Sequence, residues 1–143
     1  MRTVLLTLIL TLGACVQPDP RSTPERAAKA FIDSLERLEL SSARRRFYQL
    51  IDEKSRASLD ARARMAESLS HRPFRGPDMI VPTKSIFRFK PEPIRREDLR
   101  VDGDRATLTL RGKRGSSRAE LELVREEGGW VILLGLEALG DDA

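Results

Sequence analysis

The hydrophobic period of this chain changes once, near His71, and that change limits the folds available to it. Before His71, apolar residues recur at intervals of three and four, the spacing of one helix face. After His71 they alternate with polar residues, the spacing of a half-buried strand. The expected helices therefore all precede the expected strands. This order predicts an α+β fold, with N-terminal helices packed on one face of a curved antiparallel sheet.

Three helices are expected before His71. Thr23, Pro24 and Glu25 form a start signal for the first, at about 24–38. Ser41 or Ser42 is expected to cap the second, and the third is expected at about 55–70. Their apolar faces are Ala27, Ala28, Phe31, Leu35 and Leu38; Ala43, Phe47, Leu50 and Ile51; and Leu59, Ala63, Ala66 and Leu69.

Strands are expected after a proline- and glycine-rich break at 71–83. Alternation around Phe87 and Phe89 predicts a strand at about 84–90. Asp102-Gly103 predicts a tight turn between two further strands, and another strand is expected from Ala119 to Leu123. The continuous apolar run 130–134 is typical of a central strand covered on both faces.

The N-terminus has the three-part layout of a secretory signal: one arginine, an apolar run and a small-residue exit. The run is too short to span a bilayer. Leu12-Gly13-Ala14-Cys15 resembles a bacterial lipobox, which implies cleavage between Ala14 and Cys15 and a fatty-acyl (palmitate-type) diacylglyceryl group on the Cys15 sulfur. The alternative is a buried strand or helix at 3–12 with Cys15 as a small core residue.

This signal predicts both the domain organisation and the cellular location of the protein. Residues 1–14 would be the signal peptide, 15–23 the lipidated cysteine and an extended tether, 24–136 a single domain and 137–143 a tail. The resemblance implies a lipoprotein anchored to a membrane of the cell envelope. An aspartate after the cysteine retains many such proteins in the inner membrane. Val16 stands at that position here, so the outer membrane is favoured.

Three stretches carry a second resemblance: Pro24 to Leu35, Val101 to Leu108, and Leu123 to Ile132 with its acidic Gly-Gly-Trp turn. Together they resemble small bacterial lipoproteins of the nuclear transport factor 2-like (cystatin-like) superfamily. The resemblance implies a cone with an interior cleft, which some members use for steroid or polyketide chemistry and others only for binding. The candidate lining residues here are Phe31, Tyr48, Phe87, Leu108 and Trp130.

Candidates for chemistry are few. His71 is the one histidine and has no partner by spacing. Tyr48 could approach Asp33 or Asp52, but a tyrosine at the core edge is the simpler interpretation. Asp102-Gly103-Asp104 begins like a calcium loop but lacks the later ligands, and Glu126-Glu127 is expected to be a solvated turn. A single cysteine excludes a disulfide framework and a multi-cysteine zinc cage. The sequence therefore predicts no catalytic residue, cofactor or metal.

The charges are unevenly distributed. Residues 41–75 carry nine Lys and Arg against four acids, whereas 119–143 carry Arg125 against seven acids. A basic helical face near a membrane could bind anionic lipid, a cell-wall polymer or an envelope protein. It could also be a solvated face of an arginine-rich chain. Nucleic acid is not expected as a partner, because the chain has an export signal and few aromatic residues for stacking.

These patterns favour a lipid-anchored envelope protein whose single domain is a non-catalytic binding or assembly module. One alternative is a small enzyme or apolar-ligand carrier that uses the cleft of the cone. A purely structural subunit of an envelope complex is the third. The fold class alone cannot choose among them.

Overall fold

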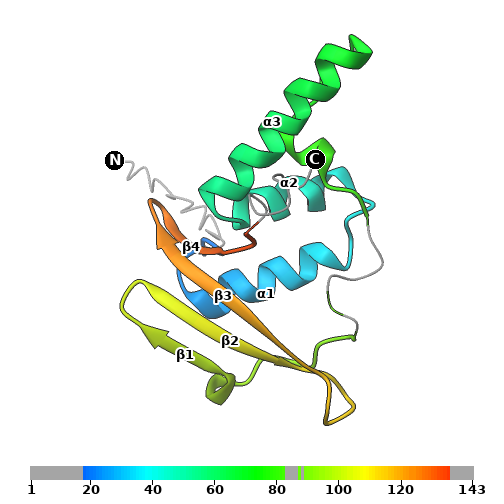
Figure 1. Cartoon of the computed structure of the whole chain (residues 1–143). Helices are drawn as coiled ribbons and strands as arrows, with labels where there is room; N and C mark the ends of the chain where they lie inside the picture. The colour runs from blue at the N-terminus through cyan, green and yellow to red at the C-terminus, as the bar shows by residue number, and fades with distance from the viewer. Residues whose placement is uncertain (1–17, 83–86, 88, 136–143) are drawn as a thin grey trace, which may run out of the picture.

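A computed structural model of the chain describes residues 18–82, 87 and 89–135 (Figure 1). Ala14, Cys15 and the 137–143 tail lie outside the described residues. The described part contains three helices followed by a four-stranded antiparallel sheet, which confirms the α+β class. The elements are α1 Pro24–Leu35, α2 Ser41–Leu50, α3 Glu53–Ser70, the 3-10 turns η1 Gly76–Met79 and η2 Arg96–Asp98, and the strands β1 Leu99–Asp102, β2 Arg105–Arg111, β3 Arg118–Glu126 and β4 Gly129–Ile132.

The sheet is a meander in which each strand pairs with the next, in the order β1-β2-β3-β4. The expected tight turn joins β1 and β2, but its two residues are Gly103, with a positive φ of 57°, and Asp104, one residue later than Asp102-Gly103, because Asp102 still pairs with Arg105. In β2 and β3 the register pairs Ala106 with Leu123 and Leu108 with Leu121, which puts these side chains on one face. That face is buried, whereas Glu122 on the other face is exposed.

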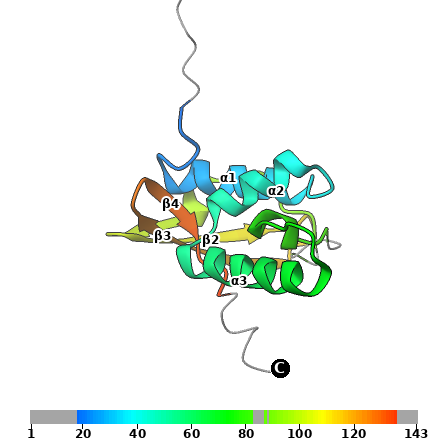
Figure 2. The same ribbon diagram turned by 90° about the horizontal axis from the view of Figure 1, so that it is seen from above.

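The helices cover the buried face from the β4 side. α1 packs against β3 and β4, and α2 packs against α1 and β4. Seen from above, α1 and α2 lie next to each other beside the sheet (Figure 2). The core between these layers comprises Ala27, Ala28, Phe31, Leu38, Phe47, Leu50, Ile51, Leu59, Ile80, Phe87, Ala106, Leu108, Leu110, Leu121, Leu123, Trp130 and Ile132.

The position of β4 differs from the sequence prediction. It is the last strand of the sheet that the described residues form, not a central one, although Trp130 and Ile132 are buried as expected. Its outer edge is occupied by backbone from elsewhere. The Trp130 N–H donates to the Arg21 carbonyl at 2.8 Å, and the Asp52 N–H donates to the Ile132 carbonyl at 2.9 Å. The apolar run of β4 is therefore buried because distant segments of the chain cover it, although β4 is not a central strand.

The Gly128-Gly129 turn is shaped by its contact with Arg21. Both glycines have a positive φ, and a Cβ added to Gly129 would overlap the Arg21 backbone, so only glycine fits there. The Arg21 guanidinium donates to the Glu127 carbonyl at 3.1 Å. The contacts of the domain thus begin at Arg21. Only residues 16–20 separate it from Cys15.

The helix boundaries agree in part. Thr23 caps α1 as expected, but α1 ends at Leu35 and the chain turns before Leu38. The predicted cap at Ser41 or Ser42 is wrong. Both serines lie inside α2, whose N-cap is Leu40 without a side-chain hydrogen bond. α3 starts two residues earlier than expected, because Asp52 caps it.

The strand expected at 84–90 is not formed by the residues described there. Phe87 and Phe89 lie in bends and Lys90 in irregular backbone, while 83–86 and 88 lie outside the described residues. Phe87 is nevertheless buried, and the centroids of the two rings are 6.2 Å apart. Phe87 and Phe89 therefore contact each other through their rings.

Candidate functional site

The candidate cleft-lining residues are mostly core residues. Phe31 and Leu108 are fully buried, and Phe87 and Trp130 are nearly so. All four belong to one hydrophobic cluster, in which the Phe31 ring stacks on Phe47 with centroids 5.0 Å apart. Four of the five candidates therefore fill the space between helices and sheet.

Tyr48, the fifth candidate, bonds to a carboxylate other than the two considered from sequence. Its hydroxyl donates to Asp60 Oδ2 at 2.7 Å, which links α2 to α3. Gly76 of η1 packs directly against this pair, since a Cβ at Gly76 would overlap both the Tyr48 ring and Asp60. Burial, the hydrogen bond to Asp60 and the negative charge of Asp60 raise the pKa of Tyr48 to about 12, although Arg56 opposes them. The arrangement joins three elements and holds the phenol in its neutral form.

Because the chain has one tyrosine, its ionisation can be followed directly by ultraviolet absorbance. We expect the Tyr48 phenol to titrate near pH 12, about two units above an exposed tyrosine. Asp60→Asn should lower this pKa, because the replacement removes the negative charge beside the phenol. Asp33→Asn, a change on the exposed part of α1, should leave it unchanged. A midpoint near pH 10 in the folded wild type would contradict the Tyr48–Asp60 contact.

Asp52 is the most enclosed carboxylate of the described residues, with 2% of its surface exposed. Its Oδ1 accepts the Ser55 N–H at 2.9 Å, and its Oδ2 accepts the Ser55 hydroxyl at 2.6 Å and the Leu134 N–H at 3.0 Å. Burial alone would raise the pKa of Asp52, but these hydrogen bonds together hold the pKa below its usual value. Asp52 is therefore a charged helix cap that ties α3 to the chain after β4.

Glu126 is not simply part of a solvated turn, contrary to expectation. Its Oε1 accepts the Glu53 N–H at 2.9 Å, and its Oε2 lies 3.1 Å from Arg56 Nη2. The Arg56 guanidinium also donates to the Ile51 carbonyl at 2.8 Å. Glu126 and Asp52 therefore satisfy different N–H groups at the start of α3. This end of α3 is fixed to the sheet.

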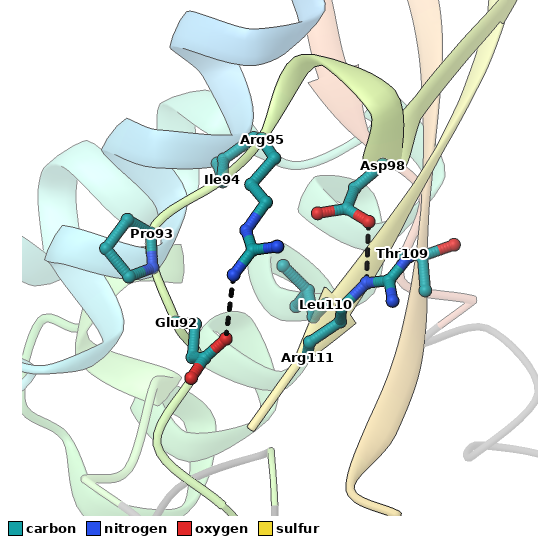
Figure 3. A pocket seen from close by; sticks show the side chains of 8 residues that line it. All are labelled: Glu92, Pro93, Ile94, Arg95, Asp98, Thr109, Leu110 and Arg111. Atoms are coloured by element: carbon teal, nitrogen blue, oxygen red, sulfur yellow. Dashed lines mark hydrogen bonds and ion pairs between the residues drawn. The ribbon is translucent and has the colours of Figure 1, made fainter. Parts of the chain in front are cut away.

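A narrow crevice lies between β2 and the segment before β1 (Figure 3). Inside it, Arg111 Nε donates to the buried Asp98 Oδ1 at 2.7 Å, an ion pair that the sequence did not suggest. Arg95 reaches Glu92 at 3.7 Å on the other side. The crevice has no room for a molecule as large as water. Its charges hold the η2 segment on the sheet and do not form a ligand site.

Two wider hollows lie on the surface of α1. One, of about 370 Å³, lies between α1 and α2 and is lined by Asp33, Arg37 and Arg46 among others. The other, of about 500 Å³, lies between α1 and residues 90–94, where Lys90 is 3.7 Å from Glu36. The described residues that line these hollows include no histidine, cysteine or tyrosine. Their linings carry both acidic and basic side chains.

His71 has a backbone role. It is the C-cap of α3, with a left-handed φ of 57°, and its N–H donates to the Glu67 carbonyl at 2.8 Å. Its side chain is exposed. A non-glycine residue in this conformation ends the helix. The role of His71 that the structure shows is to end α3 through its backbone.

Among residues 41–75, the excess of exposed cations over exposed acids is easier to see once buried and paired side chains are set aside. Of the four acids, Asp52 is buried and Asp60 is bonded to Tyr48, which leaves Glu53 and Glu67 exposed. Arg56 pairs with Glu126, and Arg44 donates to backbone carbonyls of the turn before α2. The exposed cations are Arg45, Arg46, Lys54, Arg62, Arg64, Arg72 and Arg75.

Comparisons with protein-family models, with curated proteins and with solved structures find no match for this chain. Within residues 18–82, 87 and 89–135, no three His, Cys, Asp or Glu side chains are grouped to hold a metal ion. Over the same residues, no helix combines the length and apolarity needed to cross a membrane.

Proposed function

We propose that this chain is a lipoprotein of the bacterial cell envelope, held to its membrane by acyl chains on Cys15. One observation carries the proposal: the only cysteine follows Leu12-Gly13-Ala14 at the end of a short apolar run. Two or three acyl chains on one residue give stable anchoring, whereas a single chain holds a protein only marginally. Val16 favours the outer membrane over the inner one.

We further propose that the domain is a non-catalytic binding or assembly module. Its support comes from the candidate cleft residues, four of which are core residues, and from Tyr48, whose hydroxyl is engaged by Asp60. The same packing counts against an enzyme or carrier that uses an interior cleft. The one-sided basic surface on α2, α3 and the loop after them is the feature of the domain best suited to a partner.

A relationship to the nuclear transport factor 2-like superfamily is part of this proposal. Its support is the order of elements, three helices and then a meander that ends in the Gly128-Gly129-Trp130 turn. The fold class would not assign an activity even within that superfamily. The function proposed here therefore rests on the surface and the anchor.

The anchor is tested by labelling cells with a fatty-acid probe. We expect the wild-type chain to take up the probe and Cys15→Ser to lose the signal entirely and to accumulate as the uncleaved precursor. As a matched control, Cys15→Ser combined with Ser22→Cys keeps one cysteine in the tether but outside the lipobox, and should also stay unlabelled. Equal labelling of Cys15→Ser and the wild type would refute the proposal.

A further inference from the structure

The second half of α3 extends beyond the body of the domain (Figure 1). Ser55, Leu59 and Ala63 bury the first half, but of residues 64–70, all of which the structure describes, none is buried. Met65 is 66% exposed and Leu69 is 79% exposed. Leu69 was expected to lie on the packed face and does not. Two large apolar side chains thus stand in solvent on a helix end that the fold leaves without cover.

These two residues belong to a longer line along α3. Lys54, Ser58, Arg62, Met65 and Leu69 are spaced by four, four, three and four residues, so they share one face of the helix, which we name the α3 stripe. All but the half-buried Ser58 are exposed. The acids of α3, Glu53, Asp60 and Glu67, recur every seven residues on the other side. The stripe therefore combines cations and apolar side chains without an acid.

The Lys54 end of the stripe lies near the tether, and the Leu69 end lies far from it. Glu53, at the start of α3, bonds to Glu126, and Arg21, where the tether meets the domain, bonds to the neighbouring Glu127. α3 then runs for 18 residues, about 27 Å, away from this point. Six residue steps separate Cys15 from Arg21, which span about 20 Å at full extension. In Figure 2 the chain before α1 leaves the domain on the α1 side, whereas α3 lies on the opposite side. The tether must therefore turn back along the domain for the stripe to reach the surface to which Cys15 is anchored.

We propose that the α3 stripe rests on an anionic phospholipid surface, with Lys54 and Arg62 against the headgroups and Met65 and Leu69 at the boundary with the acyl chains. Cations flanking exposed apolar residues on one helix face are typical of helices that lie in such an interface. Arg72 and Arg75, exposed just beyond α3, add to the positive charge. The inference rests on the proposed Cys15 anchor, which would keep the stripe near the bilayer at high effective concentration.

The test uses the lipidated chain purified from membranes and reconstituted through its anchor. Leu69→Cys carries a polarity-sensitive fluorophore, and the acylated Cys15 sulfur does not react with it. On vesicles containing one third phosphatidylglycerol we expect a blue shift of the emission, lost at high salt and absent on phosphatidylcholine alone. The same probe at Ala57→Cys, an exposed position off the stripe, should show no shift.

Charge reversal supplies the matched controls. Lys54→Glu with Arg62→Glu should abolish the shift, whereas Arg105→Glu with Arg118→Glu, an equal change at exposed positions of the sheet, should keep it. All of these sites are exposed, and circular dichroism verifies that the variants fold. A chain that floats with the vesicles but shows no shift, or the same shift on both lipids, overturns the inference and leaves the anchor standing. A blue shift of the emission that appears only when an acidic protein is added, and not with the vesicles, would also overturn the inference.

Failure of the anchor would look different, because the wild-type chain would then not float with vesicles of phosphatidylcholine alone. In that case the Leu69→Cys probe is placed on the Cys15→Ser chain and mixed with the same two kinds of vesicle. A shift specific to phosphatidylglycerol still supports the α3 stripe as a lipid-binding face. Its absence overturns the inference.

Discussion

Replacing Asp52 by alanine is expected to lower the free energy of unfolding by about 3–5 kcal/mol. The change removes the side-chain N-cap of α3 and one acceptor each from the half-buried Leu134 N–H and the Ser55 hydroxyl. The loss should be measured by urea denaturation followed by circular dichroism. Asp33→Ala, an exposed aspartate on α1, is the control and should change the free energy by less than about 0.5 kcal/mol.

The same variant has a defined pH dependence. Because the pKa of Asp52 is lower in the folded chain than in the unfolded chain, its carboxylate stabilises the fold above the unfolded value, near pH 4. This contribution is lost as the pH falls through the folded pKa. The stability gap between wild type and Asp52→Ala should therefore narrow in acid. A gap that is small at pH 7, or that widens in acid, would mean that Asp52 is not the charged cap described.

Trp130→Ala is expected to cost a similar amount, about 3–5 kcal/mol, because it empties a large site in the core. Trp130 is 6% exposed and belongs to the cluster between helices and sheet. Trp130→Phe keeps most of the apolar volume and should cost clearly less. Since Trp130 is the only tryptophan, far-ultraviolet circular dichroism should follow unfolding instead of fluorescence. Nearly unchanged melting of Trp130→Ala would refute the placement of β4 against the helices.

The parts of the fold predicted from sequence are those set by local periodicity. The helical spacing before His71 and the alternation in β2 and β3 were each sufficient to identify an element, and Asp102-Gly103 identified its turn. The position of β4 was not predictable in this way. Trp130 and Ile132 are covered because Arg21 and Asp52 bond along the outer edge of the strand, and such distant contacts leave no local pattern.

The exposure of Leu69 has a related cause. From its spacing, Leu69 was expected on one face with Leu59 and Ala63, which are buried, whereas Leu69 is exposed. Spacing alone does not reveal how far the rest of the domain reaches along α3. The length of the covered stretch depends on where η1 and α2 end in space.

Partners of polar residues were predicted least well. Asp33 and Asp52 were the carboxylates considered for Tyr48, with a tyrosine at the core edge as the simpler interpretation. The hydroxyl bonds to Asp60 instead, and Gly76 packs against both residues. Asp52 carried a local signal that would have identified its role, an aspartate three residues before Ser55 at the start of a helix. Glu126 and Asp98 carried none, because their partners are 70 and 13 residues away.

The two ends of α3 differ in their contacts: the start is bonded to the rest of the domain, and the far end is exposed. Arg21, Asp52 and Glu126 bind the tether, the start of α3 and the sheet to one another. Among the described residues, the far end of α3 makes no such bond to the sheet, and Met65 and Leu69 are exposed. The anchor proposed at Cys15 would lie near the end of the domain that these bonds fix.

That account depends on Cys15, and mass spectrometry of the N-terminal peptide from the membrane-extracted protein tests it most directly. We expect the peptide to begin at Cys15, without residues 1–14, and to carry the mass of a diacylglyceryl group and of an acyl chain on the α-amine. A peptide that continues through Ala14 with an unmodified Cys15 thiol would contradict the account.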